Sequence, residues 1–347
     1  MRDIVVITPD LKPGAGGVAD HTLRLLEHLA DRGLIRTLVP PIRLSQLPTA
    51  NGKVLVQYSA YGFDHLGYPR DLIRTLIDWK RKVHGRLVVM FHEIWTFWPM
   101  MNKNRFVQML HRRSIGQLLQ QVDVAFTTTP SQLEHLRALN LRTPIELLPV
   151  GSNIRRTAQP ARESGTALLF GLQRARVRSL RQMQSSLSRL ASAGVITRLI
   201  TVGLNESSEI DRKESELLSG FGFARGFEQR GSQSEEEISR LLSKAAFGIF
   251  GQSELSYTKS GTLMAYAAHQ LNVLSESADK LKTEPSCWLV APGELIAGIS
   301  QAELQRRAHR LRDWQERTCS WGIIAGKVAD ALQLESPAQS RIETANK

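Results

Sequence analysis

The chain has 347 residues, of which 42% are hydrophobic, and a formal net charge of +12. This length and apolar content can bury a large core and predict two domains, which excludes disorder as the main state. The first apolar run, Ile4–Ile7, is too short for a signal peptide, and no later run could span a bilayer, so we expect a cytoplasmic protein. Cys287 and Cys319 lie far apart and suggest neither a disulfide framework nor a zinc site.

The stretch from Asp3 to Glu27 joins an apolar run to a helical pattern through a glycine-rich turn. Gly14, Gly16 and Gly17 can adopt backbone conformations that other residues avoid, so several N–H groups can point at one ligand oxygen beside the positive end of a helix. The pattern therefore predicts an anion site, with phosphate as its ligand. It lacks the dinucleotide fingerprint and the lysine of a P-loop, so a simple tight turn is an equal alternative.

Strand-like and helix-like segments alternate along the chain, which is typical of parallel sheets covered by helices. The strand-like runs of the first half are IVVIT, KVLVQYS, RLVVMF, VAFTTT and IELLPV. A polar segment follows from Arg155, and ALLFG, a helix near residues 178–193, TRLITVG and FGIFG then continue the alternation. Ser234 with Glu237 forms a capping-box pattern, and residues 301–334 predict one or two helices. We therefore predict two doubly wound α/β domains.

Basic residues are concentrated in the first half, where ten basic and three acidic residues lie between Arg70 and Arg113. Such a patch favours phosphates, anionic lipid or nucleic acid, although a solvated basic face is an alternative. No nucleic-acid-binding motif accompanies it, so we expect no nucleic-acid partner.

An aromatic segment precedes part of this basic patch. Trp95, Phe97 and Trp98 come directly before a stretch that carries Lys103, Arg105, Arg112 and Arg113, a combination suited to an anionic membrane surface. A buried aromatic cluster closing a pocket is the alternative. We expect the apolar positions of the following helix to face the core; they are Phe106, Met109, Leu110, Leu118, Leu119 and Val122.

Taken in order, several segments resemble a GT-B glycosyltransferase of the large retaining family 4 group over nearly the whole chain. They are GAGGVADHTLRLLEHLADRG, VQYSAYGFDHLGYPRDL, FHEIW, LPVGSNI, LLFGLQRARVRSL and SGTLMAYAAHQLNVLS. The resemblance implies two Rossmann-like domains facing across a cleft: an acceptor domain at 1–155 and a nucleotide-sugar donor domain at 156–318. The segment SWGIIAGKVADAL then corresponds to a helix at 319–335 that returns to the first domain, and a frayed tail follows at 336–347.

The resemblance places the donor phosphates at the start of a helix in the second domain. Backbone N–H groups and hydroxyls of Ser260, Gly261 and Thr262 would receive them, with Gly16 and Gly17 approaching from the first domain. An ordinary N-cap serine is the alternative.

Arginines also follow the LLFG strand, where the family places an arginine and a lysine that neutralise the leaving phosphates. Arg174, Arg176 and Arg178 are candidates for donor binding, with Arg176 or Arg178 acting in catalysis. The usual lysine position falls on Val177, so the role has moved or been lost, and each arginine could instead simply face water.

In the first domain, the resemblance implies that His92 contacts the transferred sugar from the end of a strand. Glu93, Trp95, Asp20 and His21 are the acceptor-binding candidates. A histidine held only by packing is an alternative for His92, and Asp20 or His21 would supply the base of an inverting enzyme.

One departure from the family lies in the donor domain, where two glutamates eight positions apart are expected. Here these positions are Ser256 and Met264, and Glu254 is the nearby carboxylate that remains for donor binding. A methionine removes two hydrogen-bond acceptors and changes sugar recognition. The chain also lacks an Asp-x-Asp motif, so we expect transfer without a metal or other cofactor.

These observations predict an enzyme that moves a sugar from a nucleotide-diphosphate sugar to a lipid-linked or growing saccharide, with retention, in bacterial surface polysaccharide synthesis. We expect it to be peripheral on the inner face of the cell membrane. The alternative is a catalytically impaired GT-B protein that binds nucleotide or saccharide as a partner subunit. Sugar-nucleotide epimerases share the fold, so fold alone does not fix the reaction.

Overall fold

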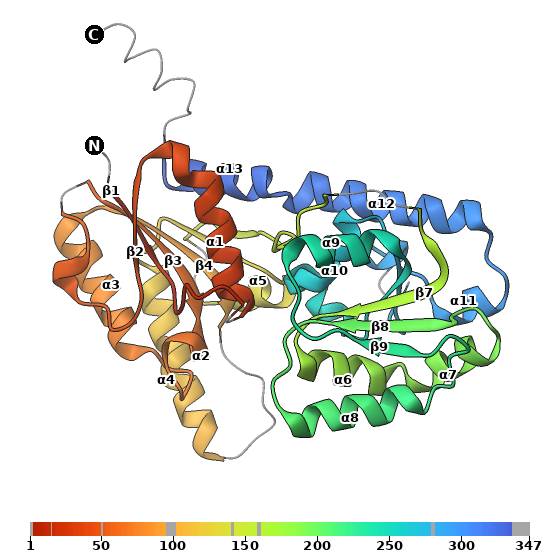
Figure 1. The fold of residues 1–347 in the computed structure, drawn as a ribbon. Coiled ribbons are helices and arrows are strands. Elements are labelled where there is room, and N and C mark those ends of the chain that lie inside the picture. The colour runs from red at the N-terminus through yellow and green to blue at the C-terminus, as the bar shows by residue number, and fades with distance from the viewer. Residues whose placement is uncertain are drawn as a thin grey trace, which may run out of the picture. The chain divides into compact units, whose positions relative to one another are not determined.

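The computed structural model describes residues 3–14, 16–49, 51–94, 102–139, 142–157, 161–278 and 282–334, without the side chains of residues 102–105. The chain divides into two compact units (Figure 1). The first unit comprises residues up to Val150 together with the segment from Trp321 onward, and the second runs from Gly151 to Ser320. The predicted tail at 336–347 lies outside the described residues.

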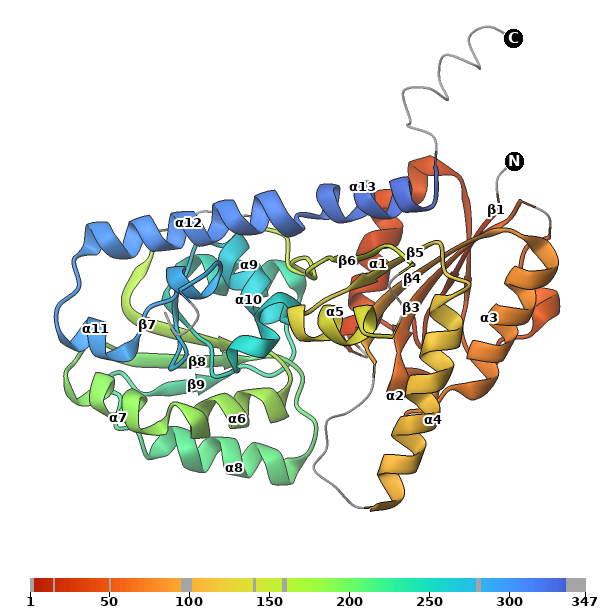
Figure 2. The ribbon, with the colours of Figure 1, turned by 180° about the vertical axis from the view of Figure 1, so that it is seen from behind.

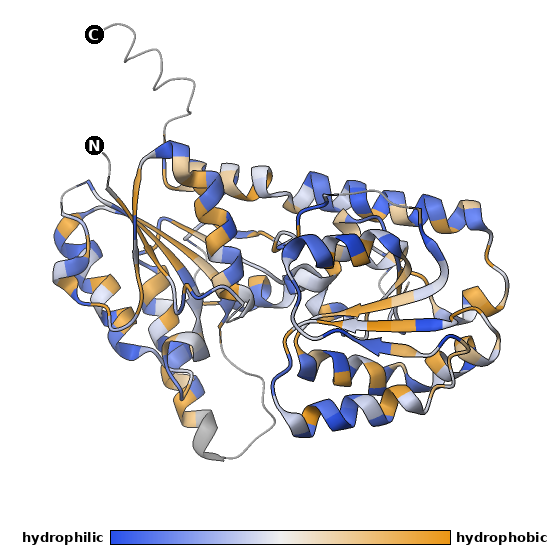
Figure 3. Cartoon of the chain, viewed as in Figure 1, coloured by the Kyte–Doolittle hydropathy of each residue, from blue (hydrophilic) through white to orange (hydrophobic). Residues whose placement is uncertain are grey.

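The first unit is built on a parallel sheet. Within the described residues it has six strands in the order β2-β1-β3-β4-β5-β6. The strands are β1 (Asp3–Ile7), β2 (Leu34–Leu38), β3 (Lys53–Ser59), β4 (Arg86–Glu93), β5 (Val124–Thr127) and β6 (Ile145–Leu147). The central strands are largely hydrophobic, as their orange colour in Figure 3 shows. This is typical of strands that helices cover on both faces, and every residue of β3 is buried.

Helices cover this sheet on both faces. They are α1 (Gly17–Leu29), α2 (Ala60–Phe63), α3 (Arg70–Val83), α4 (Asn102–Leu119), α5 (Pro130–Arg137) and α13 (Trp321–Ala331), with short 3-10 turns η1 (Ala30–Arg32) and η2 (Leu44–Gln46). Helices α3 and α4 lie side by side against this sheet (Figure 2). Their inward residues form one core cluster with alternate residues of β1, β3 and β4. The last helix, α13, packs against α1, so the end of the described chain returns to the first unit as expected.

The second unit repeats this architecture with a five-stranded parallel sheet, again within the described residues. The order is β11-β10-β7-β8-β9. The strands are β7 (Glu163–Phe170), β8 (Arg198–Val202), β9 (Phe227–Gln229), β10 (Ala245–Ile249) and β11 (Asn272–Leu274). The prediction of two parallel α/β sheets is therefore confirmed.

Two layers of helices enclose the second sheet. They are α6 (Gln173–Gln182), α7 (Gln184–Ser192), α8 (Ser208–Ser219), α9 (Glu235–Lys244), α10 (Gly261–Ala268), α11 (Pro292–Ile296) and α12 (Gln301–Cys319), with 3-10 turns η3 (Glu254–Lys259) and η4 (Ser286–Trp288). Figure 1 shows α6, α7 and α8 on one face of the sheet, with α9, α10 and α12 on the other.

Local sequence signals account for the helix starts in this unit. Ser207, Ser234, Ser260 and Ser300 each accept a hydrogen bond from the backbone N–H three residues on, which satisfies one orphan donor of the first turn. The helix start predicted from Ser234 and Glu237 is therefore confirmed. The single helix predicted near residues 178–193 is wrong, because the chain breaks at Met183 into α6 and α7.

The expectation for α4 was only partly right. Leu118, Leu119 and Val122 are buried, but Phe106 is 61% exposed and Met109 is 58% exposed. The inward stripe therefore occupies the end of the segment, whereas its earlier turns present apolar side chains to solvent. Among the described helices, none has the length and apolar content needed to cross a bilayer.

Candidate functional site

The second sheet has a topological switch point between β7 and β10. After β7 the chain adds β8 on one side of the sheet, whereas β10 and then β11 are added on the other side. In open parallel sheets such a point opens a crevice beyond the carboxyl ends of the strands, where ligands bind. The loop that follows β7 at Gly171 and the start of α10 at Gly261 both lie at this edge.

The loops at this edge approach each other too closely for side chains. A Cβ on Gly203 would lie 2.1 Å from the carbonyl oxygen of Gly171, and both glycines have positive φ angles, of +135° and +142°. Only glycine combines that backbone conformation with that separation. The two glycines thus hold the β7–α6 and β8–α8 loops together through their backbones.

The predicted phosphate-binding residues surround the first turn of α10. Ser260 is 6% exposed, and its Oγ accepts from the Leu263 N–H at 3.3 Å. The Thr262 hydroxyl donates to the carbonyl oxygen of Phe170 at 3.2 Å, which ties α10 to the end of β7. Both hydroxyls therefore have protein partners. The groups of this turn best placed for an anion are the backbone N–H groups of Gly261 and Thr262.

The three candidate arginines of α6 occupy different environments. Arg176 is 1% exposed and makes a bidentate ion pair with the buried Glu214, with Nε–Oε1 and Nη2–Oε2 distances of 2.7 and 2.9 Å. Its remaining donors reach Asn205 Oδ1 and the Gly171 carbonyl. Arg176 therefore already holds the interior of the second unit together. Val177, at the family's lysine position, is also buried.

The other two arginines lie at the surface of the second unit. Arg174 pairs with Glu206 at 3.4 Å and is 75% exposed in its side chain. Arg178 is exposed, and its side chain makes no hydrogen bond or ion pair with the part of the chain that the structure describes. Of the three, Arg178 has the guanidinium most available to a ligand.

The two positions of the missing glutamates differ in burial, because Ser256 is partly exposed whereas Met264 is not. Met264 is fully buried within α10, and its sulfur lies 3.4 Å from the Cys319 thiol. Burial raises the pKa of that thiol to about 12, as expected for a packed cysteine. Glu254, at the start of η3, is partly exposed. The Met264 side chain thus packs in the core.

In the first unit the switch point lies between β1 and β3, and the glycine-rich loop follows β1. Asp20 Oδ1 accepts from the Gly14 N–H at 2.8 Å, so this carboxylate shapes the loop. A Cβ on Gly16 or on Gly17 would meet nothing within 4 Å in the part of the chain that is described. Packing therefore does not require glycine at either position.

His92 lies at the carboxyl end of β4 within a network of neutral side chains. It is 3% exposed, and its Nε2 lies 2.7 Å from Gln57 Oε1, so this nitrogen donates to the amide oxygen. Gln132 Nε2 donates to the His92 carbonyl at 3.2 Å, and Thr127 donates to Gln132 Oε1. Gln57 and Gln132 were not predicted. The one signal in the sequence was a glutamine inside the apolar run KVLVQYS.

His21 lies beside His92 in the interior of the first unit. It is 1% exposed, and its ring centroid lies 4.9 Å from those of both His92 and Trp321. Neither ring nitrogen has a hydrogen-bond partner among the described residues, and burial lowers the pKa of His21 to about 3. The imidazole is therefore neutral at ordinary pH. Close by, Glu93 Oε2 accepts from the Ser59 hydroxyl at 3.2 Å.

The predicted membrane-contact residues lie on or before α4. Trp95, Phe97 and Trp98 lie outside the described residues, as do the side chains of Lys103 and Arg105. Arg112 and Arg113 are exposed, and together with Met109 they line a hollow of about 600 Å³. This face of α4 thus combines exposed apolar and basic side chains.

The fold matches solved glycosyltransferase structures over nearly its whole length. WaaG, a glycosyltransferase involved in lipopolysaccharide biosynthesis, is 13% identical, with a TM-score of 0.59, and the match covers 96% of this chain and 99% of WaaG. Sucrose-phosphate synthase from Thermosynechococcus elongatus is 15% identical, with a TM-score of 0.60 and complete coverage of both chains. Anabaena HepE, solved in complex with UDP and glucose, is 10% identical, with a TM-score of 0.63 and coverage of 96% and 100%.

The chain has a GT-B fold. Like these proteins, it has two Rossmann-like domains. No protein-family model matches the sequence, and no curated protein matches it. The structure thus supports the GT-B resemblance drawn from the order of the motifs. At sequence identities this low, the comparison shows a shared fold and nothing more.

Proposed function

We propose that this GT-B protein transfers a sugar from a nucleotide-diphosphate sugar to a saccharide or lipid-linked acceptor, with retention and without a metal ion. The observation that supports this most is the edge of the second sheet at its switch point. There the N-terminus of α10, the β7–α6 loop and the exposed Arg178 supply positive groups for a departing diphosphate.

The first unit supplies the acceptor side of this proposal. His92 is held at the carboxyl end of β4 by the hydrogen bond from its Nε2–H to Gln57, and we place its imidazole beside the transferred sugar. Asp20 shapes a loop in which Gly16 and Gly17 carry no side chain to obstruct a ligand. Glu93 and Ser59 add polar groups at the same edge.

A bacterial surface glycan is the setting we propose, with the protein peripheral on the inner face of the membrane. The exposed Phe106 and Met109 on α4, next to Arg112 and Arg113, support this attachment. Replacing both arginines by glutamine should weaken binding to anionic vesicles, at about 1 kcal/mol for each basic residue. Unchanged vesicle binding would contradict the attachment and leave the transferase proposal intact.

The donor site is tested by a double change, Ser260→Ala/Thr262→Ala. Thermal-shift and hydrolysis assays against UDP-, GDP- and dTDP-sugars, in the presence of a chelator, should show one preferred nucleotide for the wild type and a weaker effect for the variant. Ser300→Ala is the matched control, because it removes an equivalent N-cap from α12, a helix start that is not part of the proposed donor site. If no donor binds to the wild type, or if the two variants behave alike, the proposal fails.

A second candidate is a binding subunit without turnover. It is favoured by Val177 and Met264, which are both buried where the family carries charged groups. Nucleotide-sugar binding without hydrolysis or transfer across an acceptor panel would support this alternative. Measurable turnover by the purified chain would exclude it.

A further inference from the structure

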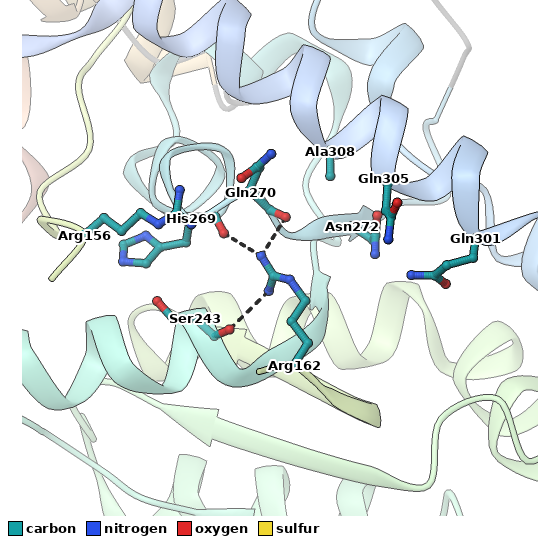
Figure 4. A pocket seen from close by; sticks show the side chains of 9 residues that line it. All are labelled: Arg156, Arg162, Ser243, His269, Gln270, Asn272, Gln301, Gln305 and Ala308. Carbon is teal, nitrogen blue, oxygen red and sulfur yellow. Dashed lines mark hydrogen bonds between the residues drawn. The ribbon is translucent and has the colours of Figure 1, made fainter. Parts of the chain in front are cut away.

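A cavity in the second unit lies at the amino ends of its strands. It has a volume of about 290 Å³ (Figure 4). Arg162 directly precedes β7, and Asn272 is the first residue of β11, so this edge is opposite to the switch-point edge where the strands end. The side chains around the cavity include Arg156, His269 and four amides, and none of the lining residues is acidic.

Arg162 has a structural task in this cavity. Its guanidinium donates to the carbonyl oxygens of Ala245 and Ser243 at the end of α9, at 2.6 and 3.4 Å. It also donates to those of His269 and Gln270 after α10, at 2.7 and 2.8 Å. One arginine thus satisfies the orphan carbonyls of two helix ends and offsets their negative dipoles.

Arg156 has no such task. The chain around it is fixed to α9, because the Arg155 N–H donates to Glu235 at 2.8 Å and the Thr157 N–H donates to Ser239 at 3.1 Å. Its own Nε and Nη1 are buried, and they bond to no acceptor in the described part of the chain. Because these N–H groups have no acceptor, the guanidinium keeps an unbalanced positive charge, which favours a ligand with anionic oxygens beside it.

The charges around Arg156 do not supply that acceptor. Burial lowers the pKa of Arg156, and the charge of Arg312 lowers it further, while Glu316 raises it. Glu316, however, pairs with Arg312 at 2.6 Å. Arg162 offsets two helix ends of roughly half a negative charge each, which leaves the charge of Arg156 uncompensated.

His269 contributes a neutral ring to the cavity. Its Nδ1 donates to the Ala265 carbonyl at 2.8 Å, so Nε2 accepts from the Ser239 hydroxyl at 2.9 Å. Burial lowers the pKa of His269 to about 4, and the two arginines lower it as well. The ring therefore adds no positive charge, and Arg156 is the cationic group to which a ligand would bind.

We propose that this cavity binds a phosphate group beside the guanidinium of Arg156, which lines it. Its volume is near the lower limit of small-molecule pockets, about 300 Å³, so it suits inorganic phosphate or the phosphate ester of a small polyol. The amides of Gln270, Asn272 and Gln305 line the remainder of the cavity and can bind hydroxyl groups. This site is separate from the proposed donor site at α10.

Calorimetric titration of the full chain with inorganic phosphate, at constant ionic strength, tests the proposal. Arg156→Gln should weaken phosphate binding about tenfold or more, because a charge-assisted contact is lost. Arg189→Gln is the control, since it removes an equal charge from an exposed position on α7 and should leave the affinity unchanged. Arg156→Lys should restore only part of the affinity, because lysine lacks the planar fork.

Two further arms identify the ligand and locate the site. Tighter binding of glycerol 3-phosphate than of phosphate would assign the site to a phosphate ester, and equal binding would assign it to the inorganic ion. The Ser260→Ala/Thr262→Ala protein should keep the Arg156-dependent binding even if it loses nucleotide-sugar binding. The proposal is overturned if Arg156→Gln binds phosphate like the wild type, or if the wild type binds none at millimolar concentrations.

Discussion

The carboxyl edges of the two sheets present different kinds of chemical group. In the first unit, neutral side chains meet in the interior: His21 packs on His92, and His92 bonds to Gln57. In the second unit, the edge consists of glycine loops, a helix N-terminus and arginines, of which Arg176 is buried and Arg178 is exposed. An edge of buried neutral groups depends on exclusion of water, whereas an edge of backbone donors and surface cations is already set for an anion.

The largest effect should come from separating the buried pair of the second unit. Arg176→Ala should lower the free energy of unfolding by about 3–5 kcal/mol, because Glu214 is left as an uncompensated buried charge. Chemical denaturation of this variant and of a double variant, Arg176→Met/Glu214→Leu, measures it. The double variant should be much less destabilised. A loss of nucleotide binding without a loss of stability would show that Arg176 serves a ligand after all.

A smaller loss is expected when a carboxylate is returned to the donor helix. Met264→Glu should reduce the free energy of unfolding by roughly 3 kcal/mol, since the position is fully buried against Cys319. Turnover should not increase. Denaturation together with a hydrolysis assay checks this, with Met264→Leu as the control for packing. Enhanced turnover would mean that the side chain of this position reaches the donor.

The first unit should respond to acid through His21. Its pKa is about 3 in the folded protein and about 6.5 when unfolded, so the unfolded chain binds the extra proton between these values and stability falls as the pH is lowered through that window. Between pH 7 and pH 5 the loss from this residue should be about 2 kcal/mol.

A variant separates His21 from the other buried histidines, whose pKa values are also lowered. His111 and His269 each titrate at about 4, so the wild type should lose stability to acid at three positions. His21→Gln should reduce the pH dependence of the free energy of unfolding by the contribution of His21 alone. An identical pH profile for the two proteins would place the His21 ring in contact with water.

The smallest effect should belong to the exposed arginine of α6. Arg178→Gln should weaken donor binding about tenfold, the equivalent of 1.4 kcal/mol, and should leave the melting temperature unchanged. Arg181→Gln, an exposed change later in the same helix, is the control. Equal donor affinities for the two variants would remove Arg178 from the proposed site and leave the backbone groups of α10 as its positive component.

Much of the architecture followed from apolar periodicity, because parallel strands buried on both faces read as continuous apolar runs. The edge strands β2 and β9 were not predicted, because they are only partly buried and do not read as apolar runs. The break at Met183 was also missed, because the sequence has neither glycine nor proline there. The inward face of α4 was predicted too broadly, because spacing alone does not show where a helix extends beyond its sheet.

The candidate site was predictable only where a ligand-binding group belongs to a local motif. The first turn of α10 follows from Ser260 and the glycine after it. By contrast, the partner of Arg176 lies 38 residues away, and that of His92 lies 35 residues away, so sequence spacing could not reveal either contact. Whether an arginine faces a ligand or a buried carboxylate depends on tertiary packing.

The contact between Gly203 and Gly171 has a consequence for the search for relatives of this chain. Any L side chain at position 203 would collide with the carbonyl oxygen of Gly171 and would crowd Nη1 of Arg176, which lies 3.1 Å from the site of its Cβ. A homologous sequence with another residue there must have rearranged the turn after β7. A glycine at position 203 therefore identifies relatives that retain this loop geometry.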